Sequence, residues 1–169
     1  MRKLTFKIAA SLALLSSGAA QAAQTKPCLT RPEVRGLVGY FLPSVLDSTI
    51  KTCTAQSNGS SFLKTRAPQL VGELTPGKEQ HWPMAKAAFA KMGKEDGTLT
   101  KIPDEVLKPM IEGTFTGMIT DKITAKNCKD ADRVLTPMAP LPGENMIDLI
   151  TEIMMLALRD DRSMPTCKD

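Results

Sequence analysis

The chain has 169 residues, of which 22 are Lys or Arg and 18 are Asp or Glu. Three of the basic residues and none of the acidic ones fall in the first 22 positions, so the rest of the chain is close to neutral. No run of basic residues remains that would predict nucleic-acid binding. The length is sufficient for one domain with its own hydrophobic core.

Residues 1–22 have the pattern of a cleavable export signal. A basic start is followed by an apolar run at residues 8–15 and by the small-residue cleavage motif Ala20-Gln21-Ala22. The apolar run is too short for a membrane anchor, so no membrane span is expected in the mature form. We therefore predict a signal peptide at residues 1–22 and a single helical domain at residues 23–169, located in the periplasm.

All four cysteines lie after the signal segment, at Cys28, Cys53, Cys128 and Cys167. An even number of cysteines in an exported chain predicts disulfides, here two. The chain has no C-x-x-C pair and a single histidine, so the pattern does not favour a metal site. No cofactor is expected.

The first predicted helix begins after Thr30, with Glu33 placed to complete a capping box. Its apolar residues recur at helical spacing as far as residue 46, but Pro43 interrupts them. Proline lacks the amide hydrogen and its ring clashes with the preceding turn, so we expect the chain to double back there. That hairpin would bring Cys28 to Cys53, which is the first disulfide that we favour.

The middle of the chain predicts further helices at residues 61–73, 75–92 and 102–123. Asn127 is expected to cap a shorter helix at residues 128–135. In the helix at 75–92, one face carries Trp82, Ala85, Phe89 and Met92. In the helix at 102–123, the side predicted to be buried consists of Val106, Met110, Ile111, Phe115, Met118, Ile119 and Ile123.

Residues 143–160 predict the helix around which the rest is organised, because apolar residues surround nearly its whole circumference. A helix of that kind is expected to be buried on several sides. If it runs antiparallel to the helix at 128–135, the tail returns Cys167 to Cys128, which is our second favoured disulfide. The fold class that we predict is all-α, a compact orthogonal or irregular bundle of about five to seven helices. Several helices would be kinked by proline, and two disulfides would staple the bundle.

Three polar groups could carry chemistry, but each has a simpler structural interpretation. His81 stands beside Trp82 without a catalytic partner at helical spacing. The cluster of Asp130, Asp132 and Arg133 is typical of an exposed helix face. The carboxylates Glu144, Asp148 and Glu152 recur every four residues and form one strip, which is either a solvated edge or a candidate acid–base or cation site.

Nine methionines follow the signal segment. Methionine fills irregular gaps in cores and suits adaptable apolar surfaces, and it is also a soft ligand for copper(I). The proline-rich, apolar stretch at residues 136–142 is expected to lie along the edge of the core. From these features we predict a ligand or partner site that includes Met138, Leu141, Met154 and Met155.

Three segments resemble small exported helical proteins of alphaproteobacterial type. They are CLTRPE at residues 28–33, WPMAKAAF at residues 82–89 and RVLTPMAPLPGEN at residues 133–145. The resemblance implies a Gram-negative periplasmic location. It implies no activity and no site residue.

No nucleophile elbow, phosphate loop or zinc-protease motif occurs in the sequence. The leading hypothesis is therefore a non-enzymatic periplasmic module that presents an apolar groove or helical face to another protein or to a small amphipathic ligand. One alternative is a hydrolase that uses the carboxylates of the strip. The other is a structural or envelope-stress protein without a small ligand.

Overall fold

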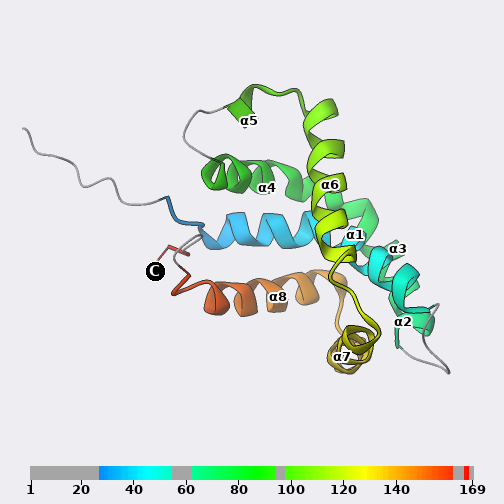
Figure 1. Cartoon of the computed structure of the whole chain (residues 1–169). Helices are drawn as coiled ribbons and strands as arrows, with labels where there is room; N and C mark the ends of the chain where they lie inside the picture. The colour runs from blue at the N-terminus through cyan, green and yellow to red at the C-terminus, as the bar shows by residue number, and fades with distance from the viewer. Residues whose placement is uncertain (1–26, 55–61, 94–97, 162–165, 168–169) are drawn as a thin grey trace, which may run out of the picture.

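The computed structural model describes residues 27–54, 62–93, 98–161 and 166–167, and they form an all-α bundle, as predicted (Figure 1). Within this part of the chain, six helices have eight or more residues: α1 (Arg31–Thr54), α3 (Ala67–Leu74), α4 (Lys78–Met92), α6 (Asp104–Thr120), α7 (Ala125–Leu135) and α8 (Gly143–Ala157). Short pieces join them: α2 (Phe62–Thr65), η1 (Thr75–Gly77), α5 (Thr98–Lys101) and η2 (Thr136–Met138). The predicted signal peptide lies outside the described residues.

The helix α1 lies at the centre of the bundle, with α4 and α8 along its two sides and α3 and α6 packed against it (Figure 1). Two glycines permit the close approach of α4. A Cβ atom at Gly36 would lie 2.7 Å from the backbone nitrogen of Ala85, and one at Gly39 would collide with the ring of His81. Since a Cβ atom at either position would overlap α4, the two glycines allow α1 and α4 to pack this closely.

The prediction that residues 143–160 form the central, buried helix is wrong. The helix α8 exists, but only Met146, Ile147 and Thr151 are buried along it. Leu149, Ile153 and Leu156 are 40%, 54% and 61% exposed. The reason is that α8 packs mainly along one neighbour, α1, so its apolar composition exceeds what that single contact can cover.

The predicted hairpin at Pro43 is also wrong, because α1 continues through Pro43 to Thr54. A proline inside a helix costs about 3 kcal/mol through the lost hydrogen bond and the ring clash. Here Phe41, Leu42 and Leu46 are buried on both sides of Pro43. Their packing offsets that cost, since tertiary contacts supply most of the stability of a helix in a protein.

Because α1 is unbroken, the disulfide pairing that we favoured is wrong. The two bonds are Cys28–Cys167 and Cys53–Cys128, not Cys28–Cys53 and Cys128–Cys167. Cys28 and Cys53 lie at opposite ends of α1, roughly 36 Å apart by helix length, far beyond the reach of one bond. The chain returns along α1 in α8, so its tail meets the beginning of α1 and not α7 (Figure 1).

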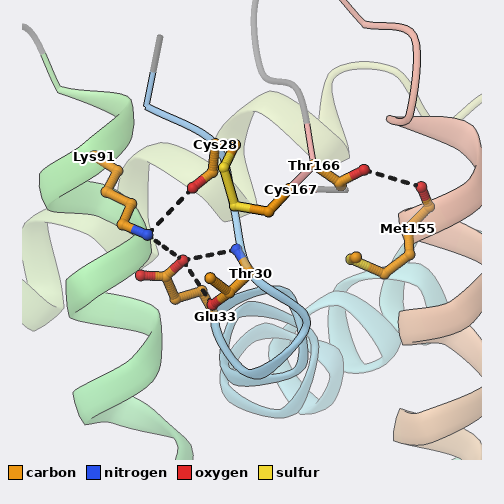
Figure 2. The surroundings of a disulfide bond; sticks show 7 residues. All are labelled: Cys28, Thr30, Glu33, Lys91, Met155, Thr166 and Cys167. Carbon is orange, nitrogen blue, oxygen red and sulfur yellow. Dashed lines mark hydrogen bonds and ion pairs between the residues drawn. A yellow bond between two sulfur atoms is a disulfide. The ribbon is translucent and has the colours of Figure 1, made fainter. Parts of the chain in front are cut away.

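The beginning of α1 is held by several short contacts (Figure 2). The backbone nitrogen and the hydroxyl of Thr30 both donate to Oε2 of Glu33 at 2.8 Å, which confirms the Glu33 half of the predicted capping box. Lys91 of α4 donates to the same oxygen at 2.7 Å. On the other side, the backbone nitrogen of Cys167 donates to the carbonyl of Leu29 at 2.9 Å, in an isolated bridge between Leu29 and Thr166.

The carboxylate of Glu33 is almost fully buried at this junction. Burial by itself raises the pKa of Glu33, but the hydrogen bonds from Lys91 and Thr30 outweigh it, and the pKa lies below its ordinary value. Glu33 therefore stays ionised and joins α1 to α4.

The helix α6 crosses the bundle (Figure 1), and its inward face agrees only in part with the predicted one. Leu107 and Ile111 are buried, and Phe115 and Ile119 are partly buried. The residues predicted to be buried but found exposed are Val106, Met110 and Met118. The start of α6 is joined to α4, because Asp104 accepts hydrogen bonds from Trp82 and Lys86 at 2.7 and 2.6 Å.

The predicted short helix at residues 128–135 is confirmed as α7, but it begins three residues earlier. Its cap is Thr124, whose hydroxyl accepts from the backbone nitrogen of Asn127 at 3.4 Å. Asn127, the predicted cap, instead donates its side-chain amide to the carbonyl of Lys122 at 2.8 Å. The disulfide to Cys53 then fixes α7 against the end of α1.

Candidate functional site

An apolar groove lies over α1, with α4 and α6 on one side and α8 on the other. We call it the α1 groove. Its volume is about 260 Å³. Its lining comes from four helices and consists of Leu37, Val38, Phe41, Leu42, Val45, Phe89, Met92, Phe115, Ile119, Ile150 and Met154.

The floor of the groove follows from the helical spacing of α1. Five of its residues recur on one side of that helix between Leu37 and Val45, a length of about 12 Å. Phe41 sits at the middle, with its ring 4.3 Å from that of Phe115 and 5.7 Å from that of Phe89. These aromatic contacts hold the α4 and α6 walls against the floor.

The groove is more exposed at its wall than at its floor. Met92, near the end of α4, is 37% exposed, while Phe41 on the floor is buried. On the opposite wall, Ile150 and Met154 of α8 are partly buried. They pack against the larger of the two hydrophobic clusters in the described part of the chain, which we call the main core. The groove therefore has a rigid aromatic and aliphatic base with pliable methionines on both walls.

The lining of the groove offers no hydrogen-bond partner, because no nitrogen or oxygen atom is exposed on its wall. An extended peptide would bury backbone N–H and C=O groups without partners, which is costly. A hydrocarbon chain, or the apolar side chains of a helix, would meet no such cost. The arrangement is therefore suited to burying uncharged apolar groups.

Of the four residues predicted to form a ligand or partner site, the groove contains only Met154. Met155 lines a separate pocket of about 380 Å³ beside Cys167. Met138 packs against the main core, and Leu141 lies in the following turn, where its backbone nitrogen donates to the carbonyl of Met138 at 3.0 Å. Three of the four, Met138, Met154 and Met155, pack against the main core, but only Met154 lines the groove.

The carboxylate strip pairs with arginines of α1. Arg35 donates from Nε to Asp148 and from Nη2 to Glu144, each at 2.6 Å, and Arg31 pairs with Glu152. The hydrogen bond from Arg35 lowers the pKa of Asp148 and keeps that carboxylate ionised. The strip therefore acts as an ion-pair ladder between α1 and α8, which accounts for its spacing without catalysis.

The two other polar groups also have structural partners. His81 is buried against Gly39, and its Nε2 atom lies 3.8 Å from Glu144. Asp132 accepts a hydrogen bond from the backbone nitrogen of Leu63 at 3.1 Å and so joins α7 to α2. Arg133 pairs with Asp130 at 3.2 Å on the exposed side of α7.

The sequence contained the residues of the groove floor but no sign that they form a groove. Leu37, Phe41 and Val45 belong to an apolar stripe that sequence reasoning assigns to the core. Phe41 is indeed buried, and what makes this stretch the floor of a groove is the placement of α4 and α6 on one side of α1 and of α8 on the other, which no local pattern encodes. The one available signal was the surplus of methionine on the flanking helices.

Comparison with protein-family models, with curated proteins and with solved structures finds no match for this chain. Among the described residues, no cluster of three or more His, Cys, Asp or Glu could hold a metal ion. None of the helices in the described ranges is both long enough and apolar enough to span a bilayer. The α1 groove is therefore the feature on which a functional argument can rest.

Proposed function

We propose that this protein is an exported, periplasmic binding module whose α1 groove holds the hydrocarbon part of an amphipathic ligand. The observation that carries the proposal is the groove itself, which is lined by eleven apolar residues from four helices and exposes no polar atom. A binding site of that composition recognises apolar surface and leaves a polar head group in solvent.

The proposed location has two supports. The first 22 residues have the three parts of an export signal. In addition, all four cysteines are paired, as expected for a protein that folds in an oxidising compartment.

The size of the groove limits the ligand. A volume of about 260 Å³ is slightly below the roughly 300–1,000 Å³ typical of drug-sized sites. A single chain along the 12 Å floor fits this space better than a fused-ring ligand would. Because the wall carries no charge, the head group should contribute little to affinity.

A chain-length series tests the proposal. Hexanol, octanol, decanol and dodecanol are titrated into protein purified from the periplasm of a bacterial host, and binding is measured by isothermal titration calorimetry. Each methylene buried should contribute about 0.8 kcal/mol, or roughly fourfold in affinity, until the chain exceeds the groove. Decanoate should bind about as well as decanol. Equal affinity along the series, or a requirement for one head-group charge, would contradict the proposal.

Two methionines of α4 provide a matched pair of variants. Met92→Trp fills the wall of the groove and should weaken decanol binding at least tenfold. Met84→Trp changes a methionine of similar exposure on the same helix that does not line the groove, and it should leave binding unchanged. If both variants bind like the parent protein, the ligand lies elsewhere.

A further inference from the structure

The two disulfides differ in their exposure to solvent. Cys53 and Cys128 are buried, at 0% and 4% exposed. Cys28 and Cys167 are both partly exposed, and their bond joins the beginning of α1 to the tail of the chain (Figure 2). In thiol–disulfide exchange a thiolate must reach one of the two sulfur atoms, so Cys28–Cys167 is the bond that a thiol in solution can attack.

A pocket beside Cys167 gives a thiol a place from which to attack. We call it the tail pocket, and its volume is about 380 Å³. Its lining consists of Arg31, Glu152, Met155, Leu156, Arg159, Thr166 and Cys167. Cys28 is not one of the described residues that line it. A small molecule in the tail pocket would therefore contact Cys167 and not Cys28.

The charges of the tail pocket favour an anion. Two guanidinium groups, of Arg31 and Arg159, face a single carboxylate, that of Glu152. Glu152 pairs with Arg31, so no other lining residue balances the charge of Arg159. Cationic neighbours stabilise a thiolate relative to its thiol, and a positive pocket raises the local concentration of an anionic reactant. The tail pocket therefore combines access to a disulfide with the charge that exchange requires.

From these observations we propose that Cys167 is a site of reversible S-thiolation by a small anionic thiol. The incoming thiolate forms a bond to Sγ of Cys167 while the bond between Cys167 and Cys28 breaks. The electron pair of the broken bond stays on Sγ of Cys28, which takes up a proton from water. Cys167 then carries the thiol as a mixed disulfide, and attack by the Cys28 thiolate reverses the reaction. The exchange needs no oxidant or reductant besides the thiol itself.

S-thiolation would remove the covalent link between the tail and the beginning of α1. The tail is also held by hydrogen bonds, from the backbone nitrogen of Cys167 to the carbonyl of Leu29 at 2.9 Å and from the hydroxyl of Thr166 to the carbonyl of Met155 at 3.3 Å (Figure 2). Once Cys28 is released, the position of the tail depends on noncovalent contacts of this kind. The modification would therefore loosen the tail while the Cys53–Cys128 bond still holds the other end of α1.

Peptide mapping of the full mature protein tests the inference. The folded, oxidised protein is incubated at neutral pH with 2-mercaptoethanesulfonate, and samples taken over time are trapped with N-ethylmaleimide and analysed by mass spectrometry. Cys167 should carry the mixed disulfide and Cys28 the maleimide. Both should appear at least about a hundredfold faster than any reaction at Cys53 or Cys128. Circular dichroism checks that the protein stays folded during the reaction.

Variants of one arginine test the role of the tail pocket. Arg159→Gln should slow the reaction with 2-mercaptoethanesulfonate about three- to tenfold and leave that with the neutral 2-mercaptoethanol nearly unchanged. Arg159→Lys keeps the charge and should restore the faster rate. The matched control is Arg133→Gln, which removes an exposed arginine of α7 that does not line the pocket, and it should react like the parent protein.

Four results would overturn the inference: equal rates at the two disulfides, no exchange before the protein unfolds, a mixed disulfide on Cys28 instead of Cys167, or an Arg159→Gln variant that does not distinguish the anionic thiol from the neutral one. No residue of the tail pocket lines the α1 groove. The inference and the proposed function are therefore tested independently.

Discussion

The helices α1 and α8 lie side by side and are joined by the same ion-pair ladder, but they have opposite relations to solvent. α1 carries charged residues and two glycines, and it is enclosed by α3, α4, α6 and α8. α8 is the more uniformly apolar of the two, and it leaves Leu149, Ile153 and Leu156 exposed.

The difference shows that close approach, more than apolar content, decides which helix becomes central. Gly36 and Gly39 let α4 contact the backbone of α1, and α1 then fills its remaining sides with core residues. The surplus apolar surface of α8 has no such partner. Exposed apolar surface of this kind is a candidate for binding.

The test with the largest expected effect on stability removes the disulfide at the end of α1. The Cys53–Cys128 bond closes a loop with a sequence separation of 75. In the chain-entropy model such a bond contributes about 4 kcal/mol to stability. Cys53→Ala with Cys128→Ala should lower the free energy of unfolding by about that amount in urea titrations. A loss below about 1 kcal/mol would mean that packing alone holds α1 in place.

A second test places a methyl group at the contact between α1 and α4. Gly36→Ala forces a Cβ atom against backbone atoms of α4, so it should cost about 3 kcal/mol despite the better helix propensity of alanine. Gly113→Ala is the matched control, because nothing lies within 4 Å of its Cβ position on α6. It should stabilise the protein by about 0.5–1 kcal/mol. Equal changes in stability for the two variants would show that α4 does not pack closely against α1 at Gly36.

The third test uses pH at the beginning of α1. The pKa of Glu33 in the folded protein lies below its ordinary value of 4.5, so its stabilising effect is present above that value. The effect is lost as the pH falls through the folded pKa. Glu33→Gln should cost about 2 kcal/mol at neutral pH and progressively less in acid, as measured by unfolding at several pH values.

Glu152→Gln on α8 is the corresponding change in the exposed ladder. It should cost less than Glu33→Gln at neutral pH, since solvent screens that pair. A stability difference between Glu33→Gln and the parent that does not vary with pH would rule out the ionised Glu33–Lys91 pair.

The last test, with the smallest expected effect on α8, shortens one leucine on each of the two helices and compares the losses of stability. Leu156 on α8 is 61% exposed, so Leu156→Ala should change stability by less than about 0.5 kcal/mol. Leu46→Ala on α1 removes a buried side chain and should cost about 3 kcal/mol. Thermal unfolding of the two variants gives both values. A large loss in Leu156→Ala would mean that α8 is covered in solution.

Local signals predicted the elements well and their assembly poorly. The helix start at Thr30 and Glu33 and the end of the helix predicted at residues 75–92 depend on neighbouring residues, and both are found. The disulfide pairing depended on whether α1 survives Pro43, which is decided by tertiary packing. The burial of α8 depended on the contacts of Gly36 and Gly39 in another helix, and the groove depended on the spacing of four helices. No local pattern carries that information.

The methionines allow the most direct test of the central claim, that the α1 groove binds a hydrocarbon chain. In protein labelled with ¹³C-methyl methionine, NMR observes a methyl signal for each methionine. Met92 and Met154 lie inside the groove, and Met84, Met110 and Met118 lie outside it. On addition of decanol to dilute protein, the methyl signals of Met92 and Met154 should shift and saturate together, while the other three stay in place. Shifts at Met84 or Met110 with none at Met92 and Met154 would contradict the account.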